Sequence, residues 1–426
     1  MGVDAISLLV LCLVIFIGYR FKVNTGLLGL AAAFILGFFV FQPIVKGGAL
    51  VALSSAAAKA KPILAGWNTN LFLVITGITL LFSIARANGT LELITNKAVA
   101  LVRGNKKLLP VMFFLIAAVI SGIGPGNVST GALLWPLAAA VAVDEGVSVV
   151  LMCLAVHAGI NVGGLSTLAP SGVIAAGVAA ANKVDVGNSV FINNGMGFIL
   201  LFVALYLIYG GWKYEAAPTS AKEVKHQAFS REQSITLCVI GLMMVGTIGF
   251  RLDAGMSAFT AAAVLLMISK VDEKTVFAGV PWSTLVMVCG VGVLVNVIGL
   301  AGGIDLLTAI LSNFANETTA SAIFVLSGGL MSAVASASGV VMPTLIPAAA
   351  KLGASLGIDP IPLISSVVYG AHLTGISPFS TGGALTMSLA GEKMDKQKLF
   401  MQLLAIAMGS MVIGAILATC RVLMYI

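Results

Sequence analysis

The chain has 426 residues, of which 59% are hydrophobic and only 9% are charged. A soluble domain carries roughly 25% charged residues, because its surface must face water, so this composition excludes a soluble enzyme, a nucleic-acid-binding protein and a disordered chain. The net charge of +7 comes from loops between apolar runs, where Lys and Arg act as orientation signals in membrane proteins. At roughly 20 apolar residues per crossing, the chain has room for about ten spans.

Apolar runs follow one another along the whole chain. The first run has no basic segment before it and no small-residue cleavage site after it, so we expect a retained span rather than a signal peptide. Two runs are too long for one helix and carry polar, Gly and Pro residues in the middle, so we expect them to be broken helices. The ten predicted spans are 4–21, 24–42, 68–87, 148–180 (broken), 187–211, 233–250, 255–270, 282–300, 360–390 (broken) and 397–425.

Two further apolar stretches, 108–145 and 320–353, predict re-entrant hairpins. The first is interrupted by Gly122-Ile123-Gly124-Pro125-Gly126-Asn127 and the second by Ser336-Ala337-Ser338-Gly339. These interruptions leave arms of roughly 12–16 residues, which is short for a complete crossing. A moderately polar segment precedes each hairpin, at 90–104 and 303–316, and we expect both segments to lie along the membrane interface.

The same order of elements occurs in both halves of the chain, and some residues recur with it. Gly164-Leu165-Ser166 returns as Gly375-Ile376-Ser377, and Pro136 returns as Pro347, both 211 positions later. This pattern predicts an internal duplication. Each half would hold five spans, an odd number, so the second half would be inserted upside down. The predicted divisions are a first repeat at 1–211 (scaffold 1–107, hairpin 108–145, spans 148–211), a linker at 212–232, and a second repeat at 233–426 (scaffold 233–316, hairpin 320–353, spans 360–426).

The distribution of positive charge predicts the orientation. Sixteen of the 23 Lys and Arg residues fall in loops on the side opposite the N-terminus. The positive-inside rule places that side in the cytoplasm. We therefore expect a multi-pass protein of the cell inner (plasma) membrane with a cytoplasmic linker, surrounded by the lipid bilayer, with both termini external.

Four interruptions can carry binding chemistry, namely the two hairpin tips and the breaks at 161–172 and 372–383. Half-helix ends at such breaks offer free N–H groups and a positive dipole end to an anion, and freed carbonyl oxygens to a cation. No Asp or Glu lies in the four segments, which argues against a carboxylate proton relay and against a cationic substrate. No Lys or Arg lies in them either, so we expect helix dipoles and neutral donors to hold an anion, with no cationic side chain nearby.

Histidine and cysteine offer little further chemistry. His157 and His372 lie just before or within the breaks, and each is either a structural residue or a group for substrate contact or proton coupling. The five cysteines show no CxxC spacing, so buried inert thiols are expected rather than a disulfide or zinc framework. A membrane enzyme needs a nucleophile–base pair or a metal cluster, and neither is visible.

At the four interruptions the sequence resembles the ion transporter superfamily, the divalent anion:sodium symporters and their relatives. The first tip, Gly126-Asn127-Val128-Ser129-Thr130, is close to the Ser-Asn-Thr tips of that family, whereas the second tip lacks the Asn and the Thr. The N-terminal portion through Asn127 is most similar to the MatC-type dicarboxylate (malonate) carriers. The resemblance implies an all-α polytopic fold, a homodimer and an elevator motion of the hairpin domain. The departure at the second tip leaves sodium and protons both open as coupling ions.

The resemblance also implies site residues and a function. The substrate-binding candidates are Asn127, Val128, Ser129, Thr130, Ser166, Thr167, Ser338, Gly339, Ser377, Pro378, Ser380 and Thr381. The candidate sodium ligands are Asn127, Gly164, Ser336 and Gly375, and the candidate coupling residues are His157 and His372. The expected function is that of a symporter that imports a small dicarboxylate such as malonate or a C4-dicarboxylate, with no cofactor other than sodium ions, no nucleic-acid partner and no enzymatic activity. The alternatives are a proton-coupled carrier of the same fold for a sugar acid or tricarboxylate and, less well supported, an ion channel.

Overall fold

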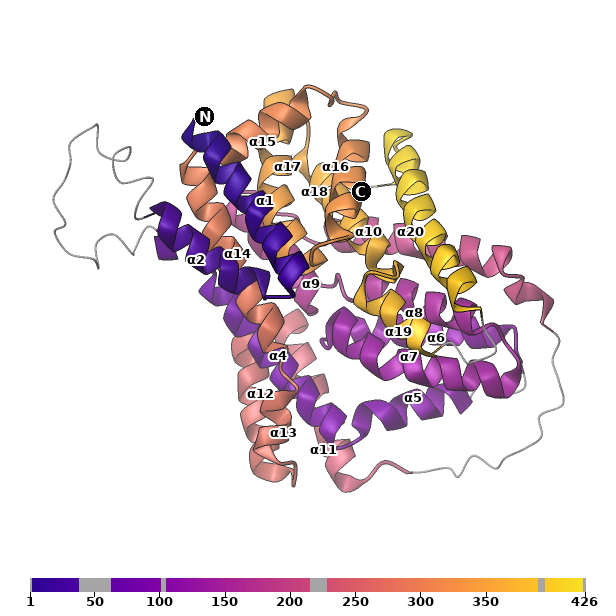
Figure 1. The fold of residues 1–426 in the computed structure, drawn as a ribbon. Helices are drawn as coiled ribbons and strands as arrows, with labels where there is room; N and C mark the ends of the chain where they lie inside the picture. Colours follow the sequence, from indigo (N-terminus) through magenta and orange to yellow (C-terminus); the bar gives the residue numbers. More distant parts are fainter. Residues whose placement is uncertain (1, 38–62, 101–104, 215–227, 390–394, 424–426) are drawn as a thin grey trace.

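The computed structural model describes residues 2–37, 63–100, 105–214, 228–389 and 395–423, and every regular element in these ranges is a helix (Figure 1). The second part of the predicted span 24–42 and most of the predicted linker lie outside the described residues. The first half contains α1 (Val3–Phe21), α2 (Thr25–Ile35), α4 (Thr69–Ala87), α5 (Thr90–Ala100), α6 (Leu108–Gly122), α7 (Gly126–Glu145), α8 (Val149–Gly163), α9 (Pro170–Ala181) and α10 (Ser189–Ile208).

The second half repeats this order and also contains α13 (Glu273–Ala278), whose counterpart region in the first half, between α2 and α4, lies largely outside the described residues. It contains α11 (Arg231–Met244), α12 (Ala254–Ile268), α13 (Glu273–Ala278), α14 (Trp282–Leu300), α15 (Gly303–Ser312), α16 (Ala320–Ser332), a π-helical turn (Ala337–Val341) that leads into α17 (Met342–Leu356), α18 (Pro360–Leu373), α19 (Thr381–Leu389) and α20 (Lys396–Thr419). The two predicted broken helices are confirmed, because α8 and α9 are separated by 164–169, and α18 and α19 by 374–380. The short helix α13 was not predicted.

Helix length decides which elements can cross a membrane. Seven described helical segments are long and apolar enough to cross, and eight further apolar ones have 10–17 residues. The first arms of the hairpins are short, with 15 residues in α6 and 13 in α16. The prediction of short second arms is wrong, since α7 and the segment Ala337–Leu356 have 20 residues each. Both continue through an internal proline, Pro136 or Pro347, which membrane helices tolerate because packed neighbours compensate for the lost hydrogen bond. The total of ten spans stays a prediction.

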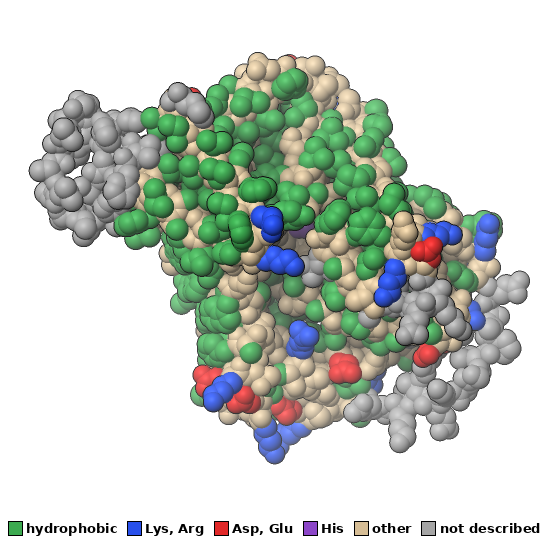
Figure 2. All heavy atoms as spheres, in the orientation of Figure 1, with side chains coloured by type: hydrophobic (Ala, Val, Ile, Leu, Met, Phe, Trp, Pro, Cys, Tyr) green, Lys and Arg blue, Asp and Glu red, His purple; other side chains and the backbone are tan. Residues whose placement is uncertain are grey.

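The surface has the polarity of a membrane protein. Figure 2 shows hydrophobic side chains over the upper part of the molecule, whereas most of the visible charged side chains lie in the lower part. Large apolar side chains such as Phe16, Leu242 and Met267 are more than half exposed. Exposing these apolar surfaces to water would cost free energy, so we infer that lipid covers them. The chain is therefore a multi-pass membrane protein.

Glycines allow the helices of the two halves to cross closely. Helix α4 packs on α12, and α14 packs on α2. A Cβ atom at Gly77 would lie 2.6 Å from the carbonyl oxygen of Gly255, and one at Gly290 would overlap that of Gly26. Small residues at membrane helix crossings permit this approach of backbones. We refer to α2, α4, α12 and α14 as the scaffold helices.

The hairpins pack on the broken helices in the same way. Helix α6 lies along α8, and α16 lies along α18. A Cβ atom at Gly159 would overlap the carbonyl oxygen of Phe114, and one at Gly370 would overlap that of Val325. Each residue of the second pair lies 211 positions after its counterpart in the first pair, the offset seen in the sequence. These paired contacts support the predicted duplication, whereas the inverted orientation of the halves stays a prediction.

Candidate functional site

The tip of the first hairpin is pressed between the scaffold and the first break. Gly124 and Gly126 have positive φ angles of 148° and 72°, which side chains with a Cβ rarely adopt. A Cβ atom at Gly124 would overlap the ring of Phe82 on α4, and one at Gly126 would lie 2.7 Å from Cδ of Pro170 on α9. Because α7 starts at this tip, its first N–H groups have no intrahelical acceptor and face the same region.

Asn127 joins the tip to both sides of the first break. Its Nδ2 donates to Oδ1 of Asn161 at 2.5 Å, and Nδ2 of Asn161 donates to the carbonyl oxygen of His157 at 2.8 Å. On the other side, the hydroxyl of Ser171 donates to Oδ1 of Asn127 at 3.4 Å. Gly164 lies directly against the same Oδ1 atom. Asn127 is therefore a hydrogen-bonded junction between α7, the end of α8 and the start of α9.

The second hairpin tip reaches the same junction. The hydroxyls of Ser338 and Ser171 share a hydrogen bond of 2.9 Å. Ser336 holds this tip in shape, because its Oγ accepts a hydrogen bond from the backbone N–H of Gly339 at 3.1 Å. A chain of polar contacts thus runs from Asn127 through Ser171 to Ser338, and it brings together two tips that are more than 200 residues apart in sequence. We call Asn127, Asn161, Ser171 and Ser338 the polar junction.

The second break lies against His157. The position that a Cβ of Gly375 would occupy is 3.0 Å from Cε1 of His157, which is buried with 3% of its surface exposed. His372 is buried as well, and its Nδ1 lies 2.8 Å from the carbonyl oxygen of Val368. Both histidines therefore lie inside the protein beside the breaks, as predicted, whereas their role in coupling stays a prediction.

Several predicted binding hydroxyls stabilise the breaks themselves. Ser166 Oγ donates to the carbonyl oxygen of Gly122 at 2.6 Å. Ser380 Oγ donates to the carbonyl oxygens of Gly375 and Ser377, and Ser377 Oγ accepts from the N–H of Phe379 at 3.3 Å. These side chains satisfy backbone groups that a broken helix leaves unpaired. They position the site. The hydroxyl protons of Ser166 and Ser380 are already used, whereas Ser377 takes part as an acceptor.

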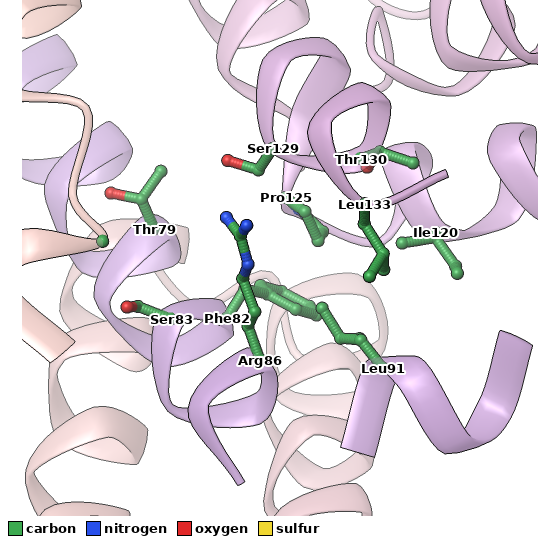
Figure 3. Close-up of a pocket in the computed structure, with 11 residues that line it drawn as sticks. Thr79, Phe82, Ser83, Arg86, Leu91, Ile120, Pro125, Ser129, Thr130 and Leu133 are labelled. Carbon is green, nitrogen blue, oxygen red and sulfur yellow. The ribbon is translucent and has the colours of Figure 1, made fainter. Parts of the chain in front are cut away.

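A pocket opens on the scaffold side of the first tip. It is lined by Thr79, Ser83 and Arg86 of α4, by Pro125 of the tip, and by Ser129 and Thr130 of α7, among others. Figure 3 shows the guanidinium of Arg86 pointing toward Ser129, between Thr79 and Pro125. The expectation that no cationic side chain lies near the tip is therefore wrong. Arg86 is in the last turn of α4, and helical side chains slope toward the helix N-terminus, so it reaches back to the tip instead of out to a loop.

The remaining predicted binding residues lie outside the polar junction. Val128 is 63% exposed, Thr167 is exposed, Pro378 is half-buried, and Thr381 begins α19. Of the candidate sodium ligands, only Asn127 and Gly164 are shown in direct contact with each other. Among the described residues no three His, Cys, Asp or Glu side chains cluster to hold a metal ion. The sequence analysis missed Asn161, Ser171 and Arg86, although the first two are polar residues inside the predicted break at 161–172.

Comparisons with known proteins agree with this architecture. Residues 1–164 match the family model of the N-terminus of the dicarboxylate carrier protein MatC. The YdaH transporter of Alcanivorax borkumensis superposes with a TM-score of 0.59 at 16% identity, covering 93% of this chain and 96% of its own. MtrF of Neisseria gonorrhoeae, described as illuminating a class of antimetabolite efflux pumps, superposes with a TM-score of 0.59 at 13% identity, covering 99% of this chain and 95% of its own. Comparison with curated protein sequences found no match.

Proposed function

We propose that the chain is a membrane transporter, namely a secondary active symporter that imports a small dicarboxylate such as malonate or a C4-dicarboxylate. The match of its first 164 residues to the model of the MatC dicarboxylate carrier N-terminus and the fold that it shares with two solved transporters over nearly its whole length support a transporter. The observation that carries the proposal is the polar junction, where both hairpin tips meet the first broken helix. Secondary transporters bind substrate at discontinuous helices of this kind.

The chemistry of the junction favours an anion. Helices α7 and α9 both begin beside it, at Gly126 and Pro170, and neither has a side-chain N-cap hydrogen bond. Free N–H groups and the positive ends of two helix dipoles therefore point into the region. The polar junction contains amides and hydroxyls but no carboxylate, so it can donate hydrogen bonds to an anion without repelling it.

The packing suits an elevator motion, which we include in the proposal. The hairpins pack on the broken helices through glycine contacts, and the scaffold helices pack on one another through a second set. Each group can therefore move as a unit relative to the other. In this scheme the protein works as a homodimer in the inner membrane, with both termini external and the scaffold helices toward the partner.

For the coupling ion we propose sodium, with protons as the alternative. Hydroxyls and freed carbonyls outnumber titratable groups at the breaks, and sodium prefers such neutral oxygen ligands over the imidazole nitrogens of His157 and His372. The second candidate is a proton-coupled carrier of the same fold whose substrate is a sugar acid or a tricarboxylate. An ion channel, the less well supported alternative, would not show saturable uptake of the substrate.

Uptake into proteoliposomes tests the coupling. With sodium coupling, an inward sodium gradient should drive saturable accumulation of a labelled dicarboxylate, and replacing sodium with choline should abolish it. The variants His157→Gln and His372→Gln should keep a sodium-dependent KM, because neither ring would carry the coupling proton. Uptake that follows a pH gradient in choline, and loses that dependence in either His→Gln variant, would contradict sodium coupling and favour protons. A panel of malonate, C4-dicarboxylates, tricarboxylates and sugar acids in the same assay separates the substrate candidates.

A further inference from the structure

The pocket beside the first tip has features that the proposed function does not use. It lies between α4 and the start of α7, no residue of the polar junction is among its lining residues, and the guanidinium of Arg86 points into it (Figure 3). None of the eleven residues that line it is acidic. In the part of the chain that is described, the only salt bridge joins Lys351 to Asp305, so none joins Arg86 to a described carboxylate. Arg86 is exposed, so its guanidinium is accessible to an anion that enters the pocket.

The opposite wall of the pocket offers hydrogen-bond donors. Ser129 and Thr130 come from the first two turns of α7, and the hydroxyl of Ser129 faces the space above Arg86 (Figure 3). Thr130 is 1% exposed, and its Oγ1 has no hydrogen-bond partner in the structure. Buried polar groups are nearly always paired, so this hydroxyl, which lines the pocket, is available to hydrogen-bond a ligand there. The positive end of the α7 dipole adds to the charge of the guanidinium.

These observations identify the chemistry of the ligand. A guanidinium presents parallel N–H donors that match the two oxygens of a carboxylate. The hydroxyls of Ser129 and Thr130 and the N-terminus of α7 supply further hydrogen-bond donors, and none of these groups carries a negative charge. The pocket is therefore suited to a carboxylate, and it lies within about one helical turn, some 5.4 Å, of Asn127 along α7. That separation matches the few ångströms between the carboxylates of a small dianion.

We propose that Arg86, with Ser129 and Thr130, binds one carboxylate of the substrate while the polar junction binds the other, and that this pair of subsites selects dicarboxylates over monocarboxylates. The inference rests on the proposed function, since it assigns the second charge of the same substrate. It also places one anchor on a scaffold helix and the other on the hairpin tip, so the contact with Arg86 must break when the hairpin group moves relative to the scaffold helices in the proposed elevator motion.

Binding of malonate and of its monomethyl ester tests the inference, because the two probes have the same backbone and differ by one negative charge. Affinities are measured on purified protein in discs of neutral lipid, so that anionic headgroups cannot occupy the pocket. The wild type should prefer malonate. Arg86→Gln should weaken malonate binding by about 10-fold to 150-fold, the equivalent of one or two charge-assisted hydrogen bonds, and should change the affinity for the ester by less than about threefold. Arg86→Lys should recover part of the loss because it restores the charge without the fork geometry.

The control is Arg20→Gln, which makes the same charge change at an exposed position in the last turn of α1 and should leave both affinities unchanged. If Arg86→Gln binds malonate as the wild type does, or loses both probes equally, Arg86 does not hold the second carboxylate and the inference is wrong. A wild type that binds both probes equally well also overturns it while leaving the proposed anion transport intact. A wild type that binds no dicarboxylate contradicts the proposed function itself.

Discussion

Replacing Asn127 with Ala is expected to weaken the apparent affinity for a dicarboxylate by about 10-fold to 150-fold, because one hydrogen bond to a charged group contributes roughly 1.5–3 kcal/mol. The side chain lies at the centre of the polar junction and bonds both Asn161 and Ser171. Its removal takes away a donor to the substrate and also loosens the partners that orient it. Asn127→Asp should be worse than Ala, since it sets a negative charge against an anion. The KM of uptake in proteoliposomes reports the change.

Asn182→Ala is the matched control for this experiment. Asn182 lies at the end of α9, where its Nδ2 donates to the carbonyl oxygen of Val178 at 2.9 Å, remote from the junction. It should change the KM by less than about twofold. If Asn127→Ala transports with unchanged affinity while it folds normally, the first hairpin tip is not part of the binding site.

Gly164→Ala is expected to reduce uptake by about 100-fold, because a methyl group at this position would overlap Oδ1 of Asn127 and push it out of the junction. Displacement of a binding group by about 1 Å can cost this much in rate. The backbone of Gly164 is in the ordinary helical region, with φ −63°, so Ala fits the backbone conformation. Besides Asn127, the methyl group would meet the carbonyl oxygen of Ile160 at 2.6 Å. The measurement is the initial rate of uptake at a fixed level of protein in the liposomes.

A double variant separates this cause from general destabilisation. If the overlap with Asn127 is the main reason, Gly164→Ala should reduce uptake much less in the Asn127→Ala background than in the wild type, because the obstructed side chain is gone and only the contact with the Ile160 carbonyl oxygen remains. Gly409→Ala on α20, where a Cβ atom would meet nothing within 4 Å, should behave as the wild type. Additive losses in the double variant would show that Gly164 matters for another reason.

Much of the fold follows from where polar residues interrupt apolar runs. Clusters of Gly, Ser, Asn and Pro within an apolar run favour backbone that leaves the helix, and such backbone is tolerated at membrane depth only where it is buried in protein or lines a cavity. This constraint located both breaks and both hairpin tips within a few residues. Helix lengths at the hairpins were harder to predict, because α7 and α17 continue through Pro136 and Pro347 with support from neighbouring helices that a sequence does not show.

The site was predicted at the level of segments and less well at the level of side chains. Asn127 and Ser338 lie in the polar junction, but the hydroxyls of Ser166 and Ser380 bond the backbone of the breaks, which depends on the tertiary position of the carbonyls. Arg86 lies at the end of a predicted span, where a positive charge is expected to belong to a loop. The side chain of Arg86 meets the hairpin tip only because α4 packs against residues that lie about 40 positions later in the chain. The slope of helical side chains toward the helix N-terminus indicates the direction of the side chain but not this neighbour.

Thermal unfolding of the purified protein with and without malonate tests the central claim most directly, namely that the polar junction is a dicarboxylate site. A ligand that binds only the folded protein stabilises it by about 2.7 kcal/mol at 100 times its Kd. We predict that malonate raises the unfolding temperature of the wild type in sodium, and that it raises the unfolding temperature of Asn127→Ala by much less at the same malonate concentration, because a 10-fold to 150-fold weaker affinity leaves only about 1.4 to 0.3 kcal/mol of stabilisation. An equal rise in both proteins, or no rise for the wild type with any small dicarboxylate, would contradict the claim.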